Sequence, residues 1–447
     1  MQSVDQIITP RWLIPVDEAR SVLEGHALAV ADDCIVALDT ADAINARYRA
    51  KAEIVLDDHA LLPGLVNAHT HAAMTLLRGY ADDLPLMEWL TEHIWPAERA
   101  WVDAGFVEIG TDLALAEMIR SGTTCFNDMY FFPEVAAARA ENAGMRACIG
   151  MIVIDDLPSA WAQNADECIN KGLELRDSVR HSALVSTAFA PHAPYSVGDK
   201  TLEKIRVLAD ELDCRIHMHI HETRREIEES TGRYGMRPLE RLDQLDLVGP
   251  RLTAIHMIQL LPGEIQTVAE HGVHVVHCPQ SNLKLGSGLC PVEKLLESGV
   301  SVAIGTDGAS SNNDLDMLGE MQTASLLAKG IGENPAALPA HATLEAATLG
   351  GARALGLEHL IGSLSPGKKA DFIAITLADS ATQPVYHPLS QLIYSAGRHQ
   401  VSDVWVGGKR LLDTRRLTTL DETEIIQKAS ELARRIGSGN NYPRPER

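Results

Sequence analysis

Residues 62–77 read L-P-G-L-V-N-A-H-T-H-A-A-M-T-L-L, and this segment combines a strand-like run with a pair of histidines. Leu65 and Val66 follow a Pro-Gly pair, and this apolar start predicts a buried strand that ends in polar residues. His69 and His71 are one residue apart, so on a strand both imidazoles face one side and can reach one metal ion. Such a pair also arises by chance, because histidine is common in cores and loops. The prediction of a metal site at the carboxyl end of a core strand therefore needs further ligands.

Length and charge limit the architecture and the partners. With 447 residues, the chain suits a barrel of roughly 250 to 300 residues together with a smaller module. The formal net charge of -22 argues against nucleic acid, because phosphate binding needs clustered Lys and Arg. A small, weakly charged substrate fits better, although solubility alone accounts for so many acidic residues.

The cysteine pattern and the amino terminus predict where the protein resides. Seven scattered cysteines without a C-x-x-C pair predict reduced thiols, with neither a disulfide framework nor a thiolate zinc site. Residues 1–29 lack the pattern of a secretion signal, and no apolar run approaches the ~18 residues of a membrane span. We therefore expect a cytoplasmic protein without a membrane partner. The oligomeric state stays open, and a homo-oligomer is compatible with the sequence.

Strand-like runs alternate with helix-like runs between residues 61 and 364, which predicts parallel strands joined by crossover helices. Eight strands are predicted, at residues 61–71, 123–129, 146–154, 184–190, 214–221, 252–257, 274–278 and 301–306. Eight such units favour an α/β fold, a closed (β/α)8 TIM-like barrel with its active site at the carboxyl ends of the strands.

The two chain ends carry short strand-like runs with polar turns. These runs lie at residues 6–13, 26–30, 34–38 and 53–56, and again at 369–376 and 401–412. We predict that residues 1–60 and 365–447 together build a small β-sandwich module with a terminal helix. Residues 61–364 then form the metal-dependent hydrolase barrel.

The fifth predicted strand carries an unusual histidine cluster. His217, His219 and His221 alternate in C-R-I-H-M-H-I-H-E, so they share one face, and Glu222 follows at the strand end. The cluster beside a carboxylate predicts at least one metal ligand, although the spacing does not say which histidine it is.

His256 ends the sixth predicted strand in A-I-H-M, and Asp307 ends the eighth in A-I-G-T-D-G. Either residue alone is more often a turn or capping residue. A barrel, however, gathers its strand ends at one mouth, so together these positions support the metal site.

The residues also form a pattern known from other proteins. The L-P-G-L-V-N-A-H-T-H block, the histidines of strands five and six, the G-T-D-G of strand eight and the later G-K-K-A-D-F-I and V-W-V-G-G-K-R runs resemble the amidohydrolase superfamily. The resemblance covers nearly the whole chain. Within it, the segment from H-A-A-M to M-E-W-L, W-P-A-E, A-P-H-A-P-Y-S, H-I-H-E-T and S-N-L-K-L-G-S-G resemble the branch that deaminates 5'-methylthioadenosine and S-adenosylhomocysteine.

The resemblance implies one zinc ion per subunit with four ligands, His69, His71, His219 and Asp307. Iron and manganese are alternatives for this donor set. The resemblance further implies that Asp307 takes a proton from the attacking water and that His256 hydrogen-bonds the attacking oxygen. His217 and His221 are then expected to be structural.

The expected reaction is hydrolytic deamination of a purine nucleoside to its inosine analogue and ammonia. Bound zinc lowers the pKa of water from 15.7 toward ~7. Attack at C6 also requires a proton on N1 of the ring, and Glu222 is the candidate acid.

Substrate contacts follow from the resemblance. Glu98 in W-P-A-E matches a carboxylate that holds the ribose hydroxyls, and His192 in A-P-H-A-P matches a residue that contacts the nucleoside. Glu222 and Asp307 also contact the substrate in this scheme. Without the match, Glu98 would begin a solvated helix and His192 would lie in a loop. Five apolar residues are candidates either for the 5'-thioether pocket or for the core: Met74, Leu84, Leu86, Met87 and Trp89.

One difference from some members of the branch ranks the candidate substrates. Some members of the branch carry an arginine just after the third barrel strand, where it suits the homocysteine carboxylate, but residues 150–161 contain none. Methylthioadenosine is therefore preferred over S-adenosylhomocysteine, and adenosine is not excluded.

Three alternatives remain. These are a guanine, cytosine or triazine deaminase, an amide-ring hydrolase, and a non-catalytic structural relative. Glu222, three residues after His219, favours deamination over ring cleavage because it suits protonation of a ring nitrogen. The H-x-E and P-C-x-x-C motifs of the other zinc-deaminase architecture are absent from the sequence.

Overall fold

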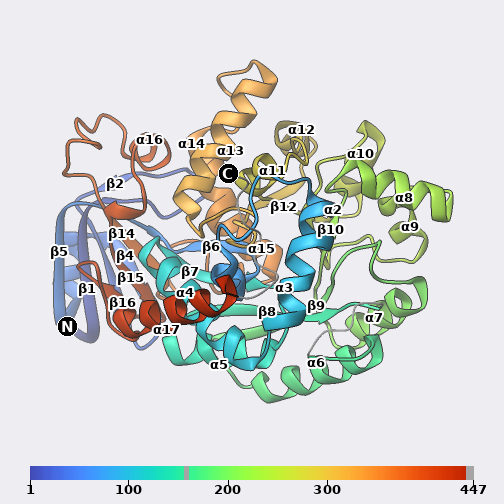
Figure 1. Cartoon of the computed structure of the whole chain (residues 1–447). Helices are drawn as coiled ribbons and strands as arrows, with labels where there is room; N and C mark the ends of the chain where they lie inside the picture. The colour runs from blue at the N-terminus through green and yellow to red at the C-terminus, as the bar shows by residue number, and fades with distance from the viewer. Residues whose placement is uncertain (156–160, 439–447) are drawn as a thin grey trace.

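The computed structural model describes residues 1–155 and 161–438, which form a nearly closed barrel beside a mixed sheet (Figure 1). The barrel sheet is parallel and has eight strands in sequence order. Its strands are β6 (Leu65–Thr70), β7 (Thr123–Asp128), β8 (Arg146–Val153), β9 (Val185–Pro191), β10 (Ile216–Ile220), β11 (Leu252–His256), β12 (His274–His277) and β13 (Ser301–Ile304). The predicted α/β barrel is therefore confirmed.

Helices cover the outside of the barrel, as Figure 1 shows. They include α4 (Ala104–Arg120), α5 (Pro133–Ala143), α6 (Ala165–Val179), α7 (Asp199–Glu211), α8 (Arg224–Tyr234), α9 (Pro238–Gln244), α10 (Pro262–Glu270), α12 (Val292–Glu297), α13 (Met317–Gly332) and α15 (Gly351–Leu355). Within the described part of the chain, none of the helices combines the length and apolar character that a membrane crossing requires.

Both chain ends build the second sheet, which has nine strands. Its N-terminal strands are β1 (Gln2–Leu13), β2 (Leu23–Glu24), β3 (His26–Ala31), β4 (Cys34–Thr40) and β5 (Tyr48–Pro63), and its C-terminal strands are β14 (Phe372–Thr376), β15 (Val401–Val406), β16 (Lys409–Asp413) and β17 (Arg416–Leu417). The two halves join where β5 pairs with β14, with Phe372 opposite Pro63. The terminal helix α17 (Glu422–Gly437) packs on α4 of the barrel. The blue and red strands of this sheet lie together at one side of Figure 1.

The first predicted barrel strand, residues 61–71, is divided at Gly64. Residues up to Pro63 belong to β5 of the second sheet, whereas β6 begins at Leu65. A side chain at Gly64 would collide with Thr124, because its Cβ would lie 2.0 Å from Thr124 Oγ1. Glycine is therefore required at the point where the chain passes from one sheet to the other.

Strands β6 and β13 approach each other through a side chain. Asn67 accepts a hydrogen bond from the Thr306 backbone N–H at 3.0 Å and donates one to Thr306 Oγ1 at 2.8 Å. Just beyond, the Asp307 N–H donates to the His69 carbonyl at 3.0 Å. These bonds bring the ends of the first and last barrel strands together and place Asp307 beside His69.

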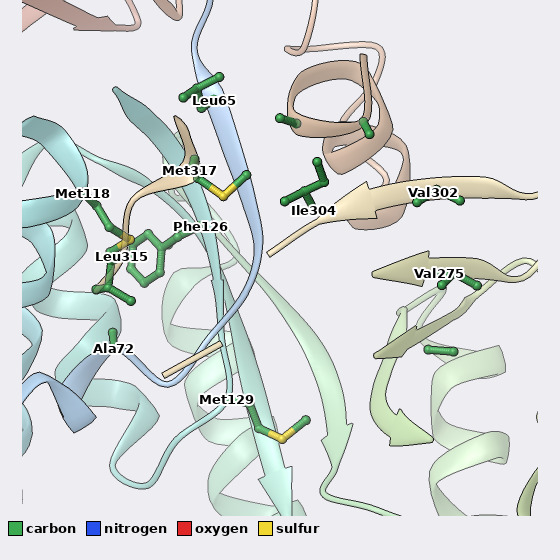
Figure 2. Packing of buried hydrophobic residues seen from close by; sticks show 14 of the residues in the cluster. Leu65, Ala72, Met118, Phe126, Met129, Val275, Val302, Ile304, Leu315 and Met317 are labelled. Atoms are coloured by element: carbon green, nitrogen blue, oxygen red, sulfur yellow. The ribbon is translucent and has the colours of Figure 1, made fainter. Parts of the chain in front are cut away.

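The core between strands and helices is apolar. Figure 2 shows Phe126 of β7 with Met118 of α4 and Leu315, three fully buried residues of one cluster. Burial of each such side chain contributes roughly 1.5–3 kcal/mol. A buried ion pair, Arg146 with Asp371 at 2.8 Å, ties the start of β8 to the second sheet.

Candidate metal and substrate site

The candidate metal ligands come from three barrel strands. His69 lies in β6 and His71 directly after it, His219 lies in β10, and Asp307 follows β13. Asp307 has a positive φ of 63°, a conformation held by the closing contacts of β6 and β13. All four side chains reach the carboxyl-end mouth of the barrel.

The structure brings the four groups together. Asp307 Oδ1 lies 3.3 Å from the Nε2 atoms of both His69 and His71. His219 Nε2 lies 3.1 Å from His69 Nε2. His256 also belongs to this cluster, since one of its ring nitrogens lies within 4.8 Å of ligand atoms of His69 and Asp307.

In two of the three histidines, the outer ring nitrogen faces a backbone carbonyl. His71 Nδ1 lies 2.5 Å from the Met129 carbonyl, and His219 Nδ1 lies 2.8 Å from the His192 carbonyl. Carbonyl oxygens only accept, so each Nδ1 carries the proton and each Nε2 presents a bare lone pair to the cluster. This is the second-sphere pattern that orients histidine ligands in metal sites.

The arrangement fits a cation. Ring nitrogens of His69, His71 and His219 and a carboxylate oxygen of Asp307 converge with contacts of 3.1–3.3 Å, so a cation among them could be bound by all four side chains. Burial lowers the pKa of His219 well below its ordinary value, which favours the neutral form that metals bind. Three imidazoles and one carboxylate form a donor set suited to zinc.

The other two histidines of β10 have different surroundings. His217 Nε2 lies 2.8 Å from His69 Nδ1, so His217 orients a candidate ligand from behind. His221 has a positive φ of 56° and turns away, and its Nε2 accepts the Leu239 N–H at 3.1 Å, at the start of α9. Of the three alternating histidines, only His219 reaches the cluster.

Two further groups adjoin the metal ligands. Glu222 Oε2 lies 3.8 Å from His256 Nε2. Burial, aided by the charge of Asp307, raises the pKa of Glu222 to about 8, so its carboxyl group is mostly protonated at neutral pH. A buried carboxylic acid beside a bare imidazole can transfer protons to and from a bound molecule.

A cavity of about 700 Å³ opens over these groups and contains Glu98 and His192 in its lining. Glu98, in α3 (Trp95–Trp101), accepts a hydrogen bond from the Tyr130 hydroxyl at 2.8 Å. Burial raises the pKa of Glu98 to about 7. The four candidate ligands therefore border one cavity or the metal cluster beside it, as do Glu98, His192, Glu222 and His256.

The cavity wall is largely apolar. Of the five apolar candidates, Met74, Leu86 and Trp89 line the cavity, whereas Leu84 and Met87 do not. Sequence reasoning missed several lining residues, among them Leu90, Ile94, Trp95, Phe131 and Leu285. Most of them lie on or beside the helical stretch that runs from α2 (Leu86–Glu88) through a π-helical turn, η2 (Trp89–Ile94), into α3. A bulged helix of this kind has no clear apolar period, so pattern reading did not find the wall.

The sequence of this chain matches that of a known protein family. A model of the amidohydrolase family matches residues 60–411, which is most of the chain. The chain belongs to the amidohydrolase family. Its membership confirms the resemblance inferred from the motifs, and the metal dependence of this family agrees with the converging histidines and aspartate.

The similar proteins extend over the whole length. The chain is 47% identical to a 5-methylthioadenosine/S-adenosylhomocysteine deaminase of Teredinibacter turnerae, with 98% of each chain covered. A protein of the same name from Saccharophagus degradans is also 47% identical, with 95% of each chain covered. A zinc-bound adenosine deaminase from Xanthomonas campestris matches with a TM-score of 0.97 and 51% identity, over 98% of this chain and 100% of that one. An atrazine chlorohydrolase of Arthrobacter aurescens shares the fold, with a TM-score of 0.89 at 23% identity over 96% of this chain and 100% of that one.

Proposed function

We propose that this amidohydrolase is a deaminase of purine nucleosides and that its preferred substrate is 5'-methylthioadenosine. The observation that carries the proposal is the buried carboxyl group of Glu222 next to a cluster of candidate metal ligands, in the lining of one cavity. The names of its relatives, at 47% identity over nearly the full chain, support the same reaction.

We propose that His69, His71, His219 and Asp307 hold one zinc ion. A zinc ion held there supplies a Lewis acid that makes water nucleophilic at neutral pH. The zinc-bound adenosine deaminase of Xanthomonas campestris, 51% identical, supports this choice of metal.

Glu222 acts as the acid. When the oxygen of water bonds to C6, electron density moves onto N1 of the ring, and a proton must reach N1 to neutralise it. A carboxyl group whose pKa is about 8 still holds its proton at pH 7 and gives it up readily.

Asp307 and His256 handle the water. Asp307 takes a proton from the attacking water, and His256 hydrogen-bonds the oxygen through Nε2. The proton held by Asp307 passes to the amino group, the C6–N bond breaks, and ammonia leaves. The remaining proton, on the new C6 hydroxyl, passes to Glu222, which thereby regains the proton that it gave to N1, and the 6-oxo purine keeps the oxygen of the water.

The cavity wall favours a substrate without a charged 5' group. Among the residues that the structure describes, neither Lys nor Arg lines the cavity. The segment after the third barrel strand lies partly outside the described residues, at 156–160, but its sequence contains no Lys or Arg either. A homocysteine carboxylate would therefore lose its hydration without gaining a partner, whereas a methylthio group gains apolar contact with Trp89 and Leu90. Glu98, held by Tyr130, is the group for the ribose hydroxyls, and His192 contacts the nucleoside beside it.

The test is steady-state ammonia release from methylthioadenosine, S-adenosylhomocysteine and adenosine, with guanine as the control. We expect the highest kcat/KM for methylthioadenosine. A higher value for guanine would support the guanine-deaminase alternative, and purified protein without bound metal would support the non-catalytic relative.

A further inference from the structure

The segment between β12 and Gly288 has no role in the reaction described so far. It contains α11 (Pro279–Lys284) and continues to Ser287, and its sequence is P-Q-S-N-L-K-L-G-S. We refer to residues 279–287 as the positioning segment. Its polar side chains Ser281, Asn282 and Ser287 are all buried, at 0%, 2% and 8% exposed.

The first of these side chains contacts Asp307. Ser281 Oγ donates to Asp307 Oδ2 at 2.6 Å, while Asp307 Oδ1 faces the two histidines and accepts the Gly308 N–H at 2.8 Å. The two carboxylate oxygens thus have different partners, and the serine sets which oxygen faces the metal cluster. A hydrogen bond to a charged acceptor at this distance is among the stronger kinds in proteins.

The second contacts His256. Its Nδ1 lies 2.9 Å from Asn282 Oδ1, and a carbonyl oxygen can only accept. The proton of the neutral imidazole is therefore on Nδ1, which leaves Nε2 bare on the side of Glu222 and the cavity. Asn282 thus makes His256 an acceptor toward the reacting water.

The third side chain is buried, but Ser287 Oγ has no hydrogen-bond partner within the described part of the chain. Ser287 is fixed through its backbone, since its N–H donates to the Asn282 carbonyl at 3.0 Å and its carbonyl accepts from Gln259 at 3.0 Å.

The segment is anchored from outside as well. Lys284 Nζ donates to Asp82 at 2.7 Å and to the Ser310 carbonyl at 3.0 Å. Gln280 Nε2 donates to Thr323 of α13 at 3.1 Å. Because it is fixed on both sides, the segment can hold three separate side chains in a constant relation to one another.

We propose that residues 279–287 position two reacting groups: Ser281 fixes the rotation of Asp307, and Asn282 fixes the proton of His256 on Nδ1. This inference rests on the proposed function, since it assigns supports to two of the groups named there. Ser281 and Asn282 are positioning residues, which act through their partners without touching the substrate.

The test compares three variants, Ser281→Ala, Asn282→Leu and Asn282→Asp, with the wild type. Ser325→Ala is the matched control, because Ser325 is also fully buried and donates to a backbone carbonyl, that of Leu338 at 2.8 Å, but contacts no reacting group. Each zinc-loaded protein is assayed for kcat and KM with the adenine nucleoside that the wild type turns over fastest, and for zinc content and Tm.

For Ser281→Ala and Asn282→Leu we expect kcat to fall roughly ten- to hundred-fold, with KM and Tm close to those of the control. Asn282→Asp keeps an oxygen acceptor at the same position, so it should recover much of the rate that Asn282→Leu loses. A wild-type kcat in Asn282→Leu would overturn the proposal. It would also be overturned if kcat fell equally in Asn282→Leu and Asn282→Asp and Tm fell in both variants.

A crystal structure of zinc-loaded Asn282→Leu gives a readout that does not depend on turnover. We expect the His256 ring to rotate away from its wild-type position, and an unmoved ring would count against the role of Asn282. If the wild type released no ammonia from any adenine nucleoside, the proposed function would fail, and the ring position would still decide the role of the segment.

Discussion

Replacement of Glu222 by Gln tests the acid that deamination requires. Glu222 is only 7% exposed, and burial raises its pKa to about 8, so the protonated form prevails at neutral pH. Glutamine has the same size but no proton to give. General acid catalysis contributes roughly 10²–10⁴-fold, which corresponds to about 3–5 kcal/mol of activation free energy. We therefore expect kcat to fall by that factor.

The metal must remain for the comparison to be valid. Glu222 lies beside His256 and is not one of the four proposed ligands, so zinc content should equal that of the wild type. The assay is steady-state ammonia release together with elemental analysis of the same samples. Glu228→Gln serves as the control. Glu228 is exposed on α8, so this substitution makes the same chemical change outside the cavity. A zinc-loaded Glu222→Gln enzyme with wild-type kcat would refute the assignment of Glu222 as the acid.

Three further results are expected. His219→Ala should lose bound zinc as well as activity, because its Nε2 lies among the ligands, and a normal zinc content by elemental analysis would show that the ligand on β10 was chosen wrongly. Raising the pH above about 8 should lower kcat/KM, since Glu222 loses the proton that it must donate, and an unchanged kcat/KM up to a pH of about 10 would contradict this. Arg146→Ala should lower the free energy of unfolding by roughly 3–5 kcal/mol, because Asp371 is left buried without its partner, and denaturant titration showing a loss below ~1 kcal/mol would contradict the role of this pair.

The barrel could be predicted because each of its strands is a short apolar run between helical segments, and the parallel order followed from that alternation. The choice of His219 could not be made from spacing. His217 and His219 point to the same side of β10, and their depth in the barrel decides that one faces the cluster while the other supports His69. Depth depends on the stagger of neighbouring strands, which a single sequence does not report.

The positioning segment shows the same limit. Its serines and asparagine were noticed only as part of a family motif, because a serine in a loop normally indicates a turn or cap. Ser281 and Asn282 each lie 26 residues from their partners, Asp307 and His256, and only the barrel brings them into contact. The strand break at Gly64 was missed for a related reason, since the apolar run continues unchanged through it while the pairing partner switches sheets.

Because the chain passes from the second sheet into the barrel at Gly64, the second sheet influences the orientation of the candidate metal ligands on β6. The Gly64 N–H donates to the Asp371 carbonyl at 3.1 Å, and the Asp371 side chain pairs with Arg146 at the start of β8. The start of β6 is thereby fixed against both sheets. A slip of one residue along β6 would turn His69 and His71 from the inside of the barrel to the outside, because side chains alternate along a strand. The second sheet therefore sets the register of the first barrel strand, and with it the direction of two of the four proposed ligands.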